Sequence, residues 1–457
     1  MHRTSENEAM IMDVDNGREG TRKKIVKLIF IIYFFLIFEG ALRKWFFPGL
    51  SKIIFFIRDP FVLMVYWYAF RSNILLTRKG KFIHPLLTFG MLLSLGLAVL
   101  AFLQMAFSQL KPLIILYGWR NYCFYLPLVF IIGDQFRGED LKRLLRYTLI
   151  FSIPIAMLVY KQFYSPPSAL INKSVADVVY TDTGRAGGTI VRAVGTFTFF
   201  HGHQLFIGSV IAFVLTVWVL PKKERPLGNY LLYAATAAAL LIFALDFTRM
   251  PIFMAAFTVT AVFYGGFVMR DKKLSIRTMK LVSTLVIAAL IVSSLFFAKT
   301  HKMKKDRLAY SDTKSRMAGM PKTFYGVLGV PFFGYGLGLS TRATAVMGVE
   351  GKNIFRWTGE DEWRRIIVEA GPFFGLIYIL YRTMLVIYLL RGAIKATRRS
   401  NNPLPLALIG YIGVILLIWY ITRIGSVHGY GWLFAGFCMA ANRLGERVSE
   451  GERSVWG

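Results

Sequence analysis

Arginine is the residue whose number and placement most clearly allow chemistry in this chain. Its guanidinium group is a planar fork of donors that matches phosphate oxygens, and it stays protonated at any working pH. Any single arginine could instead be solvated or contact a lipid headgroup. The set as a whole predicts a site for a phosphate-bearing ligand, and it lies in two long polar segments and at the edges of apolar stretches: Arg43, Arg58, Arg185, Arg192, Arg249, Arg307, Arg316, Arg342, Arg356, Arg364 and Arg365.

Three consecutive acidic residues, Glu360, Asp361 and Glu362, stand near the end of the second polar segment. A carboxylate there could accept a proton from an attacking hydroxyl if burial raised its pKa. Alternatively, these residues form the acidic first turn of the next helix, whose positive end favours negative charge. The sequence leaves both interpretations open.

Two further patterns resemble ligand motifs without completing them. The glycine-rich run from Pro331 to Gly338 lacks the Lys-Ser/Thr of a phosphate-binding loop, so we expect tight turns that fold the segment onto the membrane domain. His201 and His203 are spaced like two metal ligands, but no third ligand stands near them. We expect a hydrogen-bonding role for His201 and no metal.

The elements that position these residues must cross a membrane. Of the 457 residues, 55% are hydrophobic and 16% aromatic, more than a water-soluble fold of this size could bury. The net charge of +30 then belongs largely to loops that fix orientation, so no nucleic-acid partner is expected. Cys123 and Cys438 lie in apolar stretches without metal or disulfide spacing.

Apolar stretches of roughly 20 residues recur along the chain, as membrane-spanning helices require. They predict an all-α, polytopic fold with about twelve transmembrane helices, at 25–42, 59–76, 85–106, 113–133, 146–163, 204–220, 229–247, 251–269, 280–297, 366–390, 404–422 and 429–442. The last is short and could be re-entrant. The predicted organisation is a tail at 1–24, a single membrane domain at 25–445 with two long outer loops at about 164–203 and 298–365, and a tail at 446–457.

Lysine and arginine accumulate in the loops on the side of the amino terminus, which places both termini in the cytoplasm. The outer loop 43–58 breaks this rule with Arg43, Lys44, Lys52 and Arg58. Pairing with Glu39, together with a helix cap at Asp59, is one explanation. The other is that these cations line a cavity for an anionic substrate.

Four charged residues fall within or at the edge of predicted spans: Arg120, Asp246, Arg249 and Arg382. Charge in the hydrocarbon region is costly, so we expect these side chains to face protein or water. Asp246 and Arg249 are three residues apart on a predicted helix and could neutralise each other.

Several motifs, taken in order, resemble those of bacterial exopolysaccharide repeat-unit polymerases of the O-antigen ligase and polymerase superfamily. The resemblance covers nearly the whole chain, and its motifs are Phe38–Trp45 with Arg58–Pro60, Arg192–Phe197, Phe247–Arg249, Pro331–Gly338, and Glu362–Trp363 through Glu369–Gly371.

The resemblance implies a GT-C-like glycosyltransferase of the bacterial inner membrane, acting at the periplasmic face without metal, cofactor or nucleotide sugar. A hydroxyl of one polyprenyl-pyrophosphate-linked oligosaccharide would attack the anomeric carbon of another with inversion. The implied base is Glu362, Glu360 or Asp361. The implied pyrophosphate ligands are Arg192, Arg249, Arg316 and Arg342, followed by Arg43, Arg58, Arg120 and Arg307. Membrane lipids and other polysaccharide export or assembly proteins are the expected partners.

Three alternatives stay open. The ligase branch of the superfamily is expected to carry a histidine near the end of the large loop, and this chain has none between His301 and His428, so we favour a polymerase. A lipid-oligosaccharide flippase or other transporter is expected to show two related halves, which the chain lacks. A non-catalytic scaffold is the third.

Overall fold

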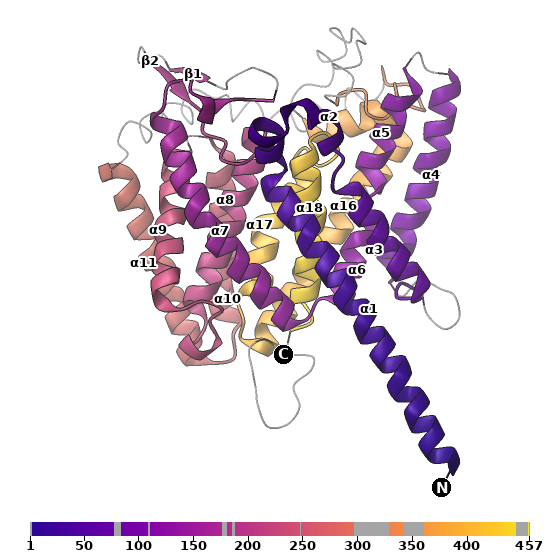
Figure 1. The fold of residues 1–457 in the computed structure, drawn as a ribbon, viewed down its shortest axis with the longest axis horizontal. Coiled ribbons are helices and arrows are strands. Elements are labelled where there is room, and N and C mark those ends of the chain that lie inside the picture. Colours follow the sequence, from indigo (N-terminus) through magenta and orange to yellow (C-terminus); the bar gives the residue numbers. More distant parts are fainter. Residues whose placement is uncertain are drawn as a thin grey trace.

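The computed structural model describes residues 2–76, 84–107, 110–175, 181–184, 188–246, 248–296, 329–341, 361–444 and 456. Within them the chain forms a bundle of roughly parallel and antiparallel helices (Figure 1). The α-helices are α1 His2–Ala41, α2 Ser51–Ile54, α3 Asp59–Arg71, α4 Pro85–Phe107, α5 Pro112–Cys123, α6 Leu126–Gln135, α7 Gly138–Tyr164, α8 Phe200–Val219, α9 Asn229–Leu245, α10 Met250–Val268, α11 Lys272–Phe296, α16 Glu362–Ser400, α17 Leu404–Ile418 and α18 Gly425–Ala441.

Short elements join these helices at their ends. A π-helical turn, η1 Leu42–Phe46, follows α1 directly, and the 3₁₀ turns are η2 Pro48–Leu50, η3 Leu170–Asn172 and η4 Lys222–Glu224. Strands β1 Thr181–Gly184 and β2 Gly188–Val191 form an antiparallel hairpin in which Thr181 pairs with Val191. The predicted helical class is therefore confirmed, with one short hairpin added in the first long loop.

The hairpin and α2 lie at one end of the bundle, which we call the hairpin end, and α1 begins at the other (Figure 1). Trp456 also lies away from the hairpin end, where its indole Nε1 donates to the Glu224 carbonyl oxygen at 3.0 Å. The beginning of α1 and Trp456 thus share one end, as the predicted topology requires. The compartment that each end faces stays a prediction.

Eight helical segments of the described chain are long and apolar enough to cross a membrane: Gly17–Phe46, Pro48–Arg71, Pro85–Phe107, Pro112–Gln135, Gly138–Tyr164, Phe200–Val219, Met250–Val268 and Glu362–Ser400. α9 and α17 are apolar but shorter. Each of the twelve predicted spans overlaps a helix, and α18 is continuous over 17 residues. The chain is thus a polytopic helical membrane protein by length and composition, while the count of twelve and the GT-C-like arrangement stay predictions.

The fourth predicted span is broken into α5 and α6. Pro127 stands in the first turn of α6, where its missing N–H and fixed φ favour a helix start over a helix interior. The Tyr378 hydroxyl donates to the Tyr122 carbonyl oxygen at 3.0 Å beside the break. Backbone groups freed within a membrane protein need such internal partners, because hydrocarbon offers none.

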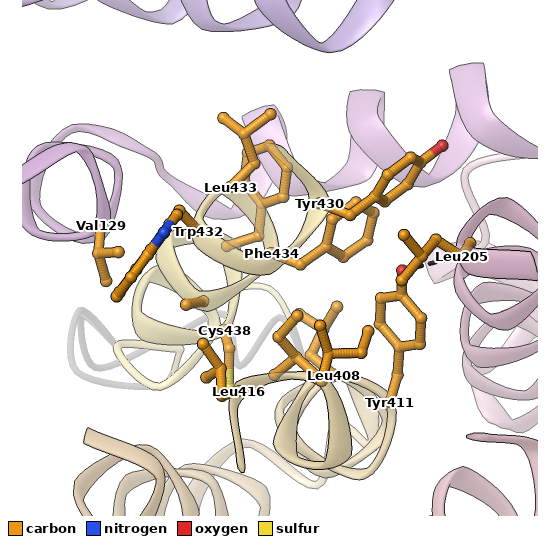
Figure 2. Packing of buried hydrophobic residues seen from close by; sticks show 14 of the residues in the cluster. Val129, Leu205, Leu408, Tyr411, Leu416, Tyr430, Trp432, Leu433, Phe434 and Cys438 are labelled. Atoms are coloured by element: carbon orange, nitrogen blue, oxygen red, sulfur yellow. Dashed lines mark hydrogen bonds between the residues drawn. The ribbon is translucent and has the colours of Figure 1, made fainter. Parts of the chain in front are cut away.

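The core is centred on α18, whose residues are almost all buried. Figure 2 shows Trp432 extending toward Val129 of α6, while Tyr430 and Phe434 lie toward Tyr411 of α17 and Leu205 of α8. The Tyr411 hydroxyl donates to the Leu205 carbonyl oxygen at 2.9 Å. Large apolar side chains on outer helices remain exposed, as expected where lipid is the solvent: Phe70, Leu92, Phe102, Phe107 and Tyr230.

The glycine-rich run folds against a kink in α16, which confirms the prediction of tight turns. Gly334, Gly336 and Gly338 all have positive φ. The kink lies at Gly371, whose φ of 78° and ψ of 166° interrupt the helix just before Pro372. A Cβ at Gly371 would overlap the Phe332 carbonyl oxygen, so the packed turn requires glycine there.

We therefore expect Gly371→Ala to destabilise the protein by about 1–3 kcal/mol, because the new methyl meets backbone and the conformation strains any other residue. The measurement is the thermal unfolding midpoint of purified protein in detergent. Gly49→Ala is the matched control, since a Cβ there meets nothing within 4 Å. Equal midpoints for the two variants would contradict the packing described for the kink.

Candidate functional site

The first polar group of the hairpin end surrounds Glu39, near the end of α1. Its two carboxylate oxygens lie 3.0 Å from Arg43 Nη1 and 3.2 Å from Arg58 Nε. Arg58 is buried and also donates from Nη2 to the Gly425 carbonyl oxygen at 3.3 Å, at the start of α18. The predicted pairing of Glu39 with Arg43 is confirmed, and Arg58 joins it.

Asp59 belongs to a neighbouring pair. Arg120 of α5 donates from Nε to Asp59 Oδ2 at 2.9 Å, and its Nη2 contacts the other carboxylate oxygen. The predicted helix cap at Asp59 is wrong, because α3 begins at Asp59 itself and its N-cap position is Arg58. A buried arginine needs a carboxylate more than the helix start needs a cap, so the carboxylate turns toward Arg120.

The second polar group surrounds Glu362, at the start of α16. Its Oε2 lies 2.7 Å from Arg365 Nη2, and its Oε1 lies 3.3 Å from Arg382 Nη1. Thr422 also donates to Oε1, from both its backbone N–H and its hydroxyl. The Glu362 side chain has no exposed surface, so its carboxylate is enclosed by cations and donors on every side. Arg382 faces protein, as expected of an intramembrane cation.

Glu369 extends this group about two turns beyond Glu362 along α16. Arg365 Nη1 lies 3.2 Å from Glu369 Oε1, and Tyr122 donates to Oε2 at 3.0 Å. The glycine-rich turn adds its own donors, with the Ser340 N–H at 3.0 Å from Oε1 and the Gly338 N–H at 3.4 Å from Oε2. The turn thus holds an internal carboxylate with backbone N–H groups rather than a phosphate.

The start of α18 connects the two groups into one layer across the bundle. Thr422 contacts Glu362, and Gly425 accepts from Arg58. Between them the His428 ring lies 4.6 Å from that of Tyr125, whose hydroxyl is 3.4 Å from Asp59 Oδ1. We call this set the ionic layer; its charged members are Glu39, Arg43, Arg58, Asp59, Arg120, Glu362, Arg365, Glu369 and Arg382.

A separate cluster of cations lies beside the ionic layer, in a narrow recess at the hairpin end. We call it the basic recess; it is lined by Lys44, Gln162, Asn172, Lys173, Ser174, Val191, Arg192, Val194 and Thr198. Lys44 is buried and donates from Nζ to the Gly195 carbonyl oxygen at 2.7 Å. No acidic residue lines the described part of this recess, in contrast to the ionic layer.

One glutamine at the end of α7 organises the walls of the basic recess. Gln162 Oε1 accepts from the N–H groups of Val194 at 3.2 Å and Gly195 at 2.8 Å, and its Nε2 donates to the Ile171 carbonyl oxygen at 3.0 Å. Asn172 in turn donates to the Gln162 and Pro166 carbonyl oxygens. Two loop segments are thereby fixed to one helix, and Lys173 and Arg192 are brought to the same recess.

Asp246 and Arg249 lie in the turn between α9 and α10, and Asp246 lies near Arg192. They do not form a helical pair, because α9 ends at Leu245 and α10 begins at Met250. Asp246 Oδ1 accepts from the Thr248 N–H at 2.7 Å and from the Thr248 hydroxyl. Burial lowers the pKa of Arg192 and the charge of Asp246 raises it, so the two residues are close enough to interact electrostatically.

The predicted phosphate ligands therefore fall into distinct places. Arg43, Arg58 and Arg120 belong to the ionic layer, Arg192 lines the basic recess, and Arg249 precedes α10. Arg307, Arg316 and Arg342 lie outside the described residues, as do Arg185, Arg356 and Glu360.

The remaining predicted residues cap or begin helices. Asp361 is the N-cap of α16 and accepts from the Trp363 N–H at 3.1 Å, which confirms the acidic first turn. His201 stands in the first turn of α8 and lies among aromatic rings, 4.2 Å from Phe200 by ring centroids. Among the described residues, no three His, Cys, Asp or Glu side chains are grouped to hold a metal ion.

Lys44 is the functional candidate that sequence reasoning missed as an individual residue. The signal was present, because Lys44 belongs to the outer loop that breaks the charge rule. What the sequence does not reveal is the π-helical turn η1, which directs Arg43 toward Glu39 and Lys44 toward Gly195. Such π turns are frequent at functional sites.

No protein-family model matches this chain, and no curated protein matches it significantly in sequence. The fold and the two charge clusters define its class as a polytopic helical membrane protein with a polar centre at one end. A more specific assignment is a proposal.

We expect Glu362→Gln to lower the free energy of unfolding by about 3–5 kcal/mol, because it leaves Arg365 and Arg382 facing a neutral side chain in a buried site. The measurement is folded protein level in membranes together with unfolding in detergent. Glu139→Gln is the control, since its exposed pair with Lys142 contributes at most about 1 kcal/mol. Normal folding of Glu362→Gln with lost activity would instead support the predicted base.

Proposed function

We propose that this protein polymerises polyprenyl-pyrophosphate-linked oligosaccharide repeat units at the periplasmic face of a bacterial inner membrane. The basic recess is the observation that carries the proposal. It combines Lys44, Lys173 and Arg192 at one end of a membrane-embedded bundle, with no acidic residue along its described lining. A cluster of cations favours an anionic ligand.

The proposed reaction needs groups that stabilise the negative charge of the leaving pyrophosphate. A sugar hydroxyl of one lipid-linked unit forms a bond to the anomeric carbon of another, the bond from that carbon to the pyrophosphate oxygen breaks, and the hydroxyl proton passes to a base. Negative charge grows on the leaving pyrophosphate, and preorganised cations stabilise it. Because the recess is narrow, the pyrophosphate would lie at its mouth, against Lys173 and Arg192.

The contacts of the ionic layer indicate which acidic residue can act as the base. Glu362 is enclosed between Arg365, Arg382 and Thr422, so a role in holding α16 and α18 together fits it better than proton transfer. Asp361 is only partly buried. Among the described residues of the acidic segment, it is therefore the better candidate for the base. The Trp363 N–H donates to Asp361 Oδ1, so Oδ2 would be the oxygen that accepts the proton.

The position of the polar residues favours an enzyme over a transporter. Transporter sites lie near the middle of the membrane, between related halves of the chain. Here the basic recess is lined by segments that follow α1 and α7, and the glycine-rich turn contacts Gln104 near the end of α4. Both features therefore lie at the ends of helices. Transfer to a different acceptor, as a ligase would perform, uses the same chemistry at the same recess and differs only in the attacking hydroxyl.

Deletion of the gene should cause single lipid-linked repeat units to accumulate on the outer face of the inner membrane, because synthesis and export of each unit continue without polymerisation. The measurement is extraction of lipid-linked oligosaccharides after labelling with a probe that cannot cross the membrane. Units trapped inside would instead identify a flippase, and polymerised chains left on the lipid carrier would identify a ligase.

Arg192→Lys keeps the charge of the recess and loses the planar fork, so polymer synthesis should fall roughly tenfold or more at unchanged protein level. The measurement is polymer yield and length from purified lipid-linked units. Arg225→Lys is the matched control, because Arg225 donates to the Leu220 carbonyl oxygen at the other end of the bundle. Normal yield and length from Arg192→Lys would remove Arg192 from the site.

A further inference from the structure

An apolar groove adjoins the basic recess at the hairpin end. Its lining consists of Lys44, Trp45, Pro48, Leu158, Leu170, Ile171 and Lys173, and its cavity volume is about 430 Å³. That volume lies within the range of roughly 300–1,000 Å³ typical of small-molecule sites. Lys44 and Lys173 line both the groove and the recess, so the two form one continuous surface.

The walls of the groove are fixed by polar contacts behind them. The Trp45 indole Nε1 donates to the Leu170 carbonyl oxygen at 3.2 Å, which joins η1 to η3 across the groove. Gln162 and Asn172 attach η3 to the end of α7. A groove that is preformed in this way loses little conformational entropy when a ligand binds.

The surroundings of the groove indicate that its ligand comes from the bilayer. The turn that follows η1 exposes a row of large apolar side chains, Phe46, Phe47, Leu50 and Ile53, each with more than half of its surface accessible. In a membrane protein such a surface faces lipid. A ligand with a hydrocarbon chain can therefore reach the groove from the side, without leaving the membrane.

We propose that this groove binds the hydrocarbon chain of a polyprenyl diphosphate next to its headgroup, while Lys173 and Arg192 bind the diphosphate at the mouth of the recess, in front of the buried Lys44. The inference rests on the proposed function for the identity of the lipid, and it adds where that lipid lies and how it enters. Two cations at the mouth suit a diphosphate better than the single phosphate of a membrane phospholipid. One groove likewise suits one chain better than two.

The test measures binding of a polyprenyl diphosphate to the full chain in nanodiscs, and separately its displacement by inorganic pyrophosphate. Leu158→Asp should weaken lipid binding roughly tenfold, because it puts a charge against the chain, and it should leave the pyrophosphate affinity unchanged. Lys173→Glu should weaken both, and its exposed position makes misfolding an inadequate explanation. Leu92→Asp is the matched control, because Leu92 is an exposed apolar residue of α4 that does not line the groove, and it should bind both probes as wild type does.

A photoreactive group in the isoprene unit next to the diphosphate gives a second readout on the wild-type protein. It should label peptides that contain Leu158 or Leu170–Ile171. Labelling elsewhere, or Leu158→Asp binding lipid as well as Leu92→Asp does, would contradict the proposed groove site.

The two proposals can fail separately. If deletion of the gene causes single units to accumulate outside while Leu158→Asp binds lipid normally, the polymerase function is supported and the lipid site in the groove is contradicted. If the Leu158→Asp and Lys173→Glu variants bind as expected while deletion leaves polymerisation intact, the groove is a lipid site that serves another reaction.

Discussion

Charge pairing inside the helix bundle is the constraint on which the rest of this structure depends. An isolated charge removed from water costs far more than a fold can offset, so each buried arginine of the ionic layer lies against a carboxylate. Glu39 with Arg58 joins α1 to the start of α3, and Asp59 with Arg120 joins α3 to α5. Glu362 with Arg365 and Arg382 joins the two parts of α16 across its kink at Gly371. Replacing such pairs by apolar residues can be neutral, whereas breaking one is costly. The layer therefore fixes which helices are neighbours and in which rotation, more than it adds net stability.

Charge pairing also distinguishes the arginines of the ionic layer from the cations of the basic recess, which cannot be told apart from the sequence. Arginines with enclosed carboxylates already have their charge compensated, so a phosphate would have to compete with a covalently tethered acid at short distance. The cations of the basic recess have carbonyl and amide groups along the described lining instead. Site selection among the arginines thus follows from where acids are placed, and acids are the scarcer residue here, at 25 against 55 basic ones.

Sequence reasoning located the helices well because hydrophobic length is a strong local signal. It predicted one span over α5 and α6, and Pro112–Gln135 is indeed one helical segment long enough to cross a membrane. The interruption between α5 and α6 was not predicted, because a proline read alone does not reveal whether it starts a helix or bends one. It assigned Asp59 to a cap because Arg120 is 61 residues away, and nothing local indicates that the two meet. The contact of Glu362 with Thr422 is likewise long-range, and its pair with Arg382 forms across the kink in α16. Local spacing is enough only for Glu39 with Arg43, which was predicted, and for Arg365 with Glu362 and Glu369, which was not.

The π-helical turn η1 connects the ionic layer to the basic recess. A regular helix through Leu42–Phe46 would rotate its side chains differently, so the wide turn is what allows the consecutive residues Arg43 and Lys44 to serve two sites. Arg43 is held by Glu39 and by the Ser51 hydroxyl at 3.0 Å, and Glu39 is itself held by Arg58. These contacts set the rotation of the turn and therefore the place of Lys44 Nζ, 2.7 Å from the Gly195 carbonyl oxygen. Residues that never touch the ligand thus determine the geometry of the recess, which explains why motif-like arginines can matter to a reaction without binding its phosphate.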